Sequence, residues 1–213
     1  MSVLMNIAVN EDLIKNVVLK NLYFLNSTVP IGVSNRHVHL SQYDLNQLFG
    51  PGYRLTPKKK VNQPGQFSCE EMVTLAGPKG LIERVRILGP VRKETQIEIL
   101  RGDTFALGVK GVLRISGDLA GTPGITLIHG SNTVTVSHGV IIAKRHIHID
   151  ENLAKEMKLS NGQNVDVQVS GERSATLNNV EVRVSRNAYY EMHVDIEEAN
   201  ACGINGSSCG RIL

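Results

Sequence analysis

The sequence has no tryptophan, only 4% aromatic residues and three cysteines among its 213 residues, and the cysteines form no Cys-x-x-Cys pair. The odd, sparse cysteine count argues against a disulfide framework and favours a reducing compartment. No apolar run approaches the roughly 20 residues that a transmembrane helix needs. The net charge is only +3, which gives little support for nucleic acid as a main partner. We therefore expect a soluble globular protein that binds neither a membrane nor nucleic acid.

Two signatures of common cofactor and nucleotide sites are also missing. The sequence contains no Walker A loop and no Gly-x-Gly-x-x-Gly loop. Because these glycine-rich loops hold nucleotide phosphates at the start of a helix, their absence leaves nucleotide hydrolysis and dinucleotide chemistry without support.

Aliphatic residues supply most of the 41% hydrophobic content. From residue 28 onward they fall into short runs that are separated by Pro-Gly, Gly-Pro, Asn-Gly and Ser-Gly turns, a pattern typical of barrels and sandwiches. The expected strands cover residues 29–33, 72–76, 82–88, 95–100, 112–116, 133–136, 140–143, 165–169 and 180–184. Helices are expected at 41–49 and 151–157. The pattern predicts a mainly β protein with short capping helices.

The first 27 residues differ from this pattern. Asn10 is a suitable N-cap, and Ile14, Val17, Val18, Leu22 and Leu25 follow at helical spacing, which predicts an amphipathic helix. The segment has neither a basic start nor a small-residue cleavage site, so a secretory signal is not expected. Two interpretations remain open: the helix packs on its own domain, or it binds a partner.

A short segment occurs twice. Residues 35–41 read NRHVHLS and residues 144–150 read KRHIHID, with the second His-x-His pair 109 positions after the first. Each copy leads into an expected helix that Ser41 or Asp150 can cap. The repeat predicts two related β-barrels about a pseudo-two-fold axis.

The two His-x-His pairs are the strongest candidates for chemistry. On a strand, residues i and i+2 point to the same side, so His37 and His39 would converge, as would His146 and His148. Two converging imidazoles are half of a zinc site. The alternative is a pair of exposed or hydrogen-bonded histidines, but the duplication favours two metal ions in one cleft.

Other side chains have weaker signals. Arg36 and Arg145 come one residue before each His pair, so on a strand they would point to the side opposite the histidines. This favours ion pairs that fix the strands. Glu98 lies on the polar side of the expected strand 95–100 and could reach a metal or be solvated. His193 is a lone histidine near a strand end and by itself is more often structural.

Basic residues cluster at 54–60 and again at 82–101. Such clusters are ordinarily solvated surface. Beside a metal cleft they could instead hold phosphate groups, because arginine matches phosphate oxygens with two parallel hydrogen bonds and lysine supplies a point charge.

Together, these motifs resemble the PduL-type phosphotransacylases, or phosphate propanoyltransferases, of bacterial microcompartments. The resemblance rests on GVSNRHVHLS at 32–41, GPVR at 89–92, TQIEI at 95–99 and RHIH at 145–148, with His193 and ANA at 199–201. It covers the chain from about residue 28 onward. It implies reversible transfer of a short acyl group, propanoyl or similar, between coenzyme A and inorganic phosphate.

The resemblance also implies two β-barrels with two zinc ions per subunit between them. One zinc would be held by His37, His39 and Glu98, and the other by His146, His148 and His193. Arg92 matches the phosphate-binding arginine. The positions that line the coenzyme A site are Ser34, Lys59, Arg86 and Asn200.

The family further suggests a homodimer and a discontinuous first barrel, formed by residues 28–35 with 144–213, around a second barrel at 36–143. Residues 1–27 resemble the encapsulation peptides of microcompartment enzymes, so we expect the protein in a microcompartment lumen within the cytoplasm, bound to shell or core proteins. From the residues alone, two alternatives stay open: a zinc-dependent hydrolase of an ester or thioester, and a barrel-type nucleic-acid module.

Overall fold

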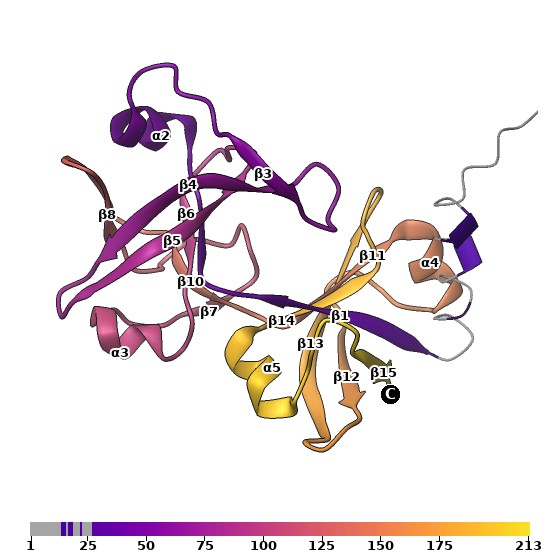
Figure 1. The fold of residues 1–213 in the computed structure, drawn as a ribbon. Helices are drawn as coiled ribbons and strands as arrows, with labels where there is room; N and C mark the ends of the chain where they lie inside the picture. The colour runs from indigo at the N-terminus through magenta and orange to yellow at the C-terminus, as the bar shows by residue number, and fades with distance from the viewer. Residues whose placement is uncertain (1–13, 16, 19–21, 23–26) are drawn as a thin grey trace, which may run out of the picture.

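The computed structural model describes residues 14, 15, 17, 18, 22 and 27–213 (Figure 1). Most of the amphipathic segment predicted within residues 1–27 therefore lies outside the described residues. Residues 14, 15, 17, 18 and 22 are helical, and the side chains of Ile14, Val17, Val18 and Leu22 are about half exposed.

One unit of the fold is a closed six-stranded barrel. Its strands follow the order β1 (Thr28–Ser34), β14 (Glu191–Asp195), β11 (His146–Asp150), β13 (Ala175–Ser185), β12 (Asn164–Val169) and β15 (Cys209–Ile212). Buried and exposed residues alternate along β12, as expected for a strand with one side facing a core. The barrel interior is filled by small aliphatic side chains such as Val29, Ile147 and Val182.

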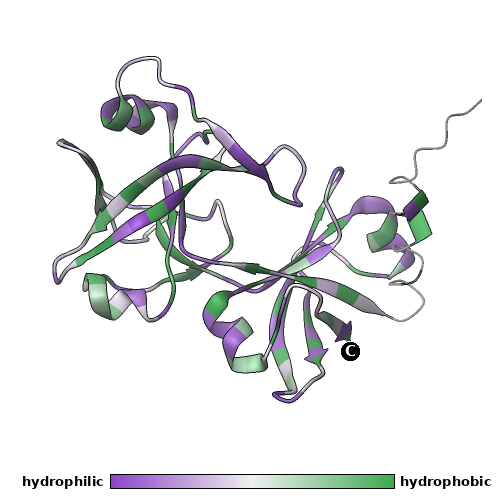
Figure 2. Ribbon diagram, viewed as in Figure 1, coloured by the Kyte–Doolittle hydropathy of each residue, from purple (hydrophilic) through white to green (hydrophobic). Residues whose placement is uncertain are grey.

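The other unit is a nine-stranded sheet that curls without closing. Its strands are β7 (Leu113–Arg114), β10 (Val140–Ala143), β6 (Gln96–Glu98), β2 (His37–His39), β5 (Leu81–Gly89), β4 (Phe67–Ala76), β8 (Ile125–His129) and β9 (Asn132–Val136), with β3 (Pro57–Lys60) paired to β4. A second aliphatic core covers its inner face and includes Leu40, Leu75 and Ile97. Polar and apolar bands alternate along β4 and β5 in Figure 2. The predicted mainly β architecture of two barrel-like units is confirmed.

The two units exchange one strand each. β1 precedes the His pair of β2 in sequence but runs parallel to β14 in the closed barrel. β10 precedes the His pair of β11 but runs parallel to β6 in the open sheet. The chain therefore crosses between the units just before each His pair, and this brings both pairs to the junction of the two sheets (Figure 1).

Four short helices lie within residues 27–213. α2 (Gln42–Phe49) and α4 (Glu151–Glu156) begin after Ser41 and Asp150, whose side chains accept hydrogen bonds from backbone amides of the first turn, so both predicted helices and their caps are confirmed. α3 (Asp103–Leu107) and α5 (Ile196–Cys202) were not predicted. None of the described helices is both long and apolar enough to cross a bilayer.

The arginine before each His pair is fixed by an acidic residue near one of these additional helices. Arg36 donates two hydrogen bonds of 2.8 Å to the buried carboxylate of Asp103 on α3. Arg145 donates one hydrogen bond, from Nε, to the carboxylate of Glu198 on α5 and another to the Asn178 carbonyl oxygen. The predicted ion-pairing role of both arginines is confirmed, and the repeat extends beyond the His pairs to the residues that hold their strands.

Candidate metal centre and active site

The same strand arrangement builds a three-residue cluster in each unit. In the open sheet, β6 runs antiparallel to β2 and places Glu98 directly opposite His37. In the closed barrel, β14 runs antiparallel to β11 and places His193 directly opposite His146. Glu98 and His193 thus occupy equivalent positions beside the first histidine of each pair.

The cluster in the open sheet consists of His37, His39 and Glu98, whose ligating atoms all lie within 4.8 Å of one another. The rings of the two histidines are 5.0 Å apart and nearly perpendicular. Nε2 of His37 lies 3.5 Å from a carboxylate oxygen of Glu98, and the other oxygen of Glu98 accepts a 2.6 Å hydrogen bond from the Gln96 amide. All three cluster side chains are buried.

The cluster in the closed barrel consists of His146, His148 and His193, with ligating atoms within the same 4.8 Å. Nε2 of His146 and Nε2 of His148 are 3.0 Å apart, and the ring of His193 lies about 5 Å from each of theirs. The Glu191 carboxylate contacts Nε2 of His193 at 2.8 Å and accepts a 2.7 Å hydrogen bond from Asn62. Three imidazoles converge on one point.

Backbone carbonyls orient the first histidine of each pair in the same way. Nδ1 of His37 lies 2.8 Å from the Asn35 carbonyl oxygen, and Nδ1 of His146 lies 2.8 Å from that of Lys144. Such contacts fix the proton on Nδ1 and leave Nε2 free to act as a ligand. Two histidines with a carboxylate, and three histidines, are donor sets that suit zinc with a coordination position left open. The residues present therefore fit a pair of zinc ions.

Burial keeps most of these imidazoles neutral. Burial and the neighbouring charges of His37 and Arg92 lower the pKa of His39 to about 3. Burial and the nearby histidines lower the pKa of His146 to about 4 and that of His148 to about 2. A neutral imidazole is the form that binds a metal ion. These histidines thus need not lose a proton at neutral pH before they bind a metal.

His37 and Glu98 behave as a charged pair. Burial opposes the charge on each group, but their mutual attraction and hydrogen bond outweigh it, so the pKa of His37 is raised and that of Glu98 is lowered. A metal ion at this cluster would take the place of the proton on His37. The pair is thus suited to a cation.

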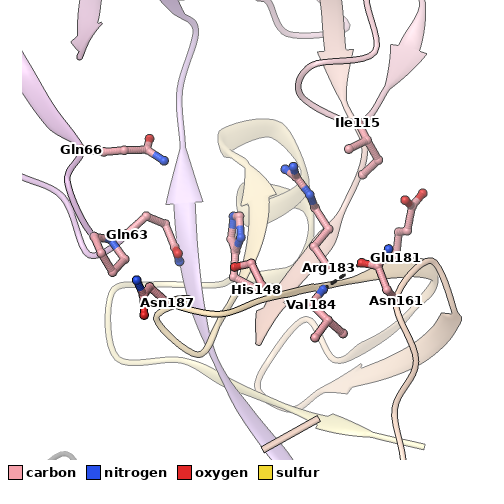
Figure 3. Close-up of a pocket in the computed structure, with 11 residues that line it drawn as sticks. Gln63, Gln66, Ile115, His148, Asn161, Glu181, Arg183, Val184 and Asn187 are labelled. Atoms are coloured by element: carbon pink, nitrogen blue, oxygen red, sulfur yellow. Dashed lines mark hydrogen bonds between the residues drawn. The ribbon is translucent and has the colours of Figure 1, made fainter. Parts of the chain in front are cut away.

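Both clusters open onto one central cavity of about 690 Å³ between the two units. Arg92 also lines this cavity, and its guanidinium donates a 2.9 Å hydrogen bond to the Ser116 hydroxyl. An adjoining cavity of about 450 Å³ shares Gln63, Gln66, His148 and Arg183 with the central one (Figure 3). The cavity combines two candidate metal positions with arginine side chains.

The structure brings all but one of the predicted site residues to the central cavity. Ser34, Lys59 and Arg86 line it together with Arg92 and both clusters. The guanidinium of Arg86 is held by the carbonyl oxygens of Cys69 and Glu70 at 2.9 Å. Asn200 is exposed on α5 and is not among the described residues that line this cavity. The role of Asn200 remains a prediction from the resemblance.

Sequence reasoning missed several cavity residues. Arg183 on β13 is paired with His148 on β11. Glu191 contacts His193, and Asn62 donates a hydrogen bond to Glu191. The sequence could have indicated Arg183, because Arg183 lies between Val182 and Val184 on an expected strand, so its side chain must point away from the core. Asn62 had none, since it comes from a loop 131 positions before His193 in the chain.

Comparison with known proteins agrees with this arrangement. A family described as phosphate propanoyltransferase matches residues 30–205. A phosphate propanoyltransferase of Enterococcus faecalis is 47% identical over 203 residues, covering 95% of this chain and 96% of the relative. The proteins of that name from Rhodopseudomonas palustris and Thermotoga maritima are 50% and 53% identical, over 86% and 82% of this chain and 81% and 84% of their own. The resemblance noted in the sequence is confirmed, and the chain belongs to the phosphate propanoyltransferase family.

Proposed function

We propose that this phosphotransacylase moves a short acyl group, propanoyl or similar, between coenzyme A and inorganic phosphate at a two-zinc site. Membership of the family supports transfer of an acyl group to phosphate. The observation that carries the finer proposal is the pair of three-ligand clusters that face one cavity with Arg92. In the proposed reaction, a phosphate oxygen bonds to the thioester carbonyl carbon as the carbon–sulfur bond breaks, which yields acyl phosphate and coenzyme A.

We assign the residues to complementary tasks. His37, His39 and Glu98 would hold the zinc nearer the coenzyme A sulfur, and His146, His148 and His193 would hold the second zinc. Zinc, when bound, supplies a Lewis acid that favours the coenzyme A thiolate and polarises the acyl carbonyl.

Arg92 would hold phosphate oxygens in a fixed direction and offset their charge. Ser34, Lys59, Arg86 and Asn200 would bind coenzyme A. Cys69 and Cys202 are buried and the pKa of Cys69 is raised by burial to about 11, so the proposal uses no cysteine nucleophile.

The reaction class is tested by following thiol release from acetyl, propanoyl and butanoyl thioesters of coenzyme A, with and without inorganic phosphate. We expect release to depend on phosphate, and acyl phosphate to form in equal amount. Thiol release that proceeds equally well without phosphate would indicate a zinc-dependent hydrolase instead. The comparison of the three thioesters also sets the preferred acyl chain length.

We also propose a domain division and an assembly. Residues 28–35 with 144–213 would form one domain and residues 36–143 the other, a division supported by the placement of β1 in the closed barrel. The subunit would form a homodimer.

Residues 1–27 would bind shell or core proteins of a microcompartment and place the enzyme in its lumen, where propanediol is degraded. This proposal is supported by the amphipathic pattern of the segment and by the half-exposed apolar side chains at 14, 17, 18 and 22.

Deletion of residues 1–27 is therefore expected to leave kcat and KM within about twofold of the full chain while abolishing packaging. The segment contributes no residue to the central cavity among the positions described, and an amphipathic helix binds through its apolar face. Co-purification with microcompartments measures the packaging. A truncated protein that is packaged normally would contradict this role.

A further inference from the structure

Arg183 is a cationic side chain of the cavity to which the proposed function gives no task. It lies on β13 beside His148, its partner in the parallel pairing of β13 with β11. Both side chains extend in the same direction in Figure 3. Arg183 lines the central cavity and also the adjoining cavity of about 450 Å³. The guanidinium therefore stands where the two cavities meet.

The Arg183 guanidinium makes no hydrogen bond or ion pair with the described part of the protein. The other cavity arginines do have partners: Arg36 binds Asp103, Arg86 binds two carbonyl oxygens, and Arg92 binds Ser116. Arg183 is only partly exposed, and burial lowers its pKa more than the nearby charges of Glu98 and Glu181 raise it. Removing a cation from water without a partner is unfavourable. A bound anion would offset that cost.

Arg92 provides a second cation on the same space from the other unit. Arg92 follows β5 of the open sheet, whereas Arg183 belongs to the closed barrel. Burial has the largest effect on the pKa of Arg92 and lowers it. The charge of Glu98 raises this pKa, and the charge of Arg183 lowers it. Two like charges repel each other, and an anion between them would offset that repulsion. Phosphate oxygens match the paired donors of each guanidinium.

We propose that Arg183 is a second phosphate-binding residue, which holds the phosphoryl group together with Arg92 at the junction of the two units. This inference rests on the proposed function and deepens it. The phosphoryl group is that of inorganic phosphate in one direction and of acyl phosphate in the other. Arg183 pairs with His148 of the second cluster, whereas Arg86 of the proposed coenzyme A site pairs with His37 of the first cluster. This placement favours the reacting phosphate over the phosphates of coenzyme A as the ligand.

The test uses the full chain with Arg183→Gln and Arg183→Lys. Arg183→Gln should raise the KM for phosphate and for acyl phosphate roughly tenfold or more, because a charged hydrogen-bond donor to phosphate is lost. The KM for coenzyme A should stay within twofold. Arg183→Lys should give an intermediate KM for phosphate, since it keeps the charge but not the paired donors. Arg186→Gln is the matched control, because the Arg186 side chain is 89% exposed and lines neither cavity.

A second readout does not depend on turnover. Inorganic phosphate should raise the melting temperature of the wild-type protein and of Arg186→Gln, since a ligand stabilises the state that binds it, and this shift should be smaller in Arg183→Gln. An unchanged KM and shift in Arg183→Gln would overturn the inference, as would an equal rise in the KM for coenzyme A. Wild-type protein without phosphate-dependent turnover would instead refute the proposed function, and a phosphate shift lost only in the Arg183 variant would still support the anion site.

Discussion

Replacement of His146 by alanine is expected to lower phosphate-dependent turnover by roughly 10³-fold or more and to remove one of two bound zinc ions. His146 lies at the centre of its cluster, 3.0 Å from Nε2 of His148 and directly opposite His193. Changes around a metal ligand already cost about 10- to 100-fold in affinity or activity, and loss of the ligand itself leaves only two donors. His37→Ala should have the same effect at the other cluster, where it also leaves Glu98 buried without its charged partner.

Metal content per chain and turnover are measured on the same purified samples. His138→Ala is the matched control, because His138 is an exposed histidine that contacts Glu94 and lines none of the cavities described above. It should keep both metal ions and full turnover. A His146→Ala protein that is folded, fully active and still binds two ions would contradict the assignment of the clusters.

Replacement of Arg92 by alanine should raise the KM for inorganic phosphate about 10- to 100-fold and change the KM for coenzyme A little. Arg92 is partly buried beside both clusters, and among the described residues its guanidinium has one hydrogen-bond partner, the Ser116 hydroxyl. The remaining donors are available to phosphate oxygens. Hydrogen bonds between charged groups are worth about 1.5–3 kcal/mol, which corresponds to the expected range.

Steady-state kinetics with each substrate varied in turn gives the two KM values. Lys93→Ala is the control from the same turn, because Lys93 is exposed and does not line the cavity among the described residues. It should leave both KM values unchanged. If Arg92→Ala raised the KM for coenzyme A and left that for phosphate alone, Arg92 would belong to the coenzyme A site instead.

The parts of the site that follow from local sequence were predictable. Alternation along a strand is a short-range rule, so the convergence of His37 with His39 and of His146 with His148 could be read directly. The caps Ser41 and Asp150 predicted the starts of α2 and α4, because a capping side chain accepts hydrogen bonds from backbone amides only two or three residues away. The duplication of RHxH then indicated two related units.

The parts that depend on pairing between distant strands were not predictable from the residues alone. The placement of Glu98 opposite His37 joins positions 61 residues apart, and alternation along the strand alone favoured a solvated Glu98 over a metal ligand. The exchange of β1 and β10 between the units has no local signal. β3 reads PKKK and all four of its residues are exposed, so it lacks the apolar alternation that marks a strand. Family resemblance, rather than periodicity, indicated Glu98 and His193.

The central claim is that the duplicated histidine pairs hold two zinc ions in one cavity. X-ray diffraction from crystals of the active, full-length protein, recorded on both sides of the zinc absorption edge, tests it most directly. We predict two anomalous peaks per chain, one among His37, His39 and Glu98 and one among His146, His148 and His193. Fully active crystals with no peak at either cluster would contradict the account.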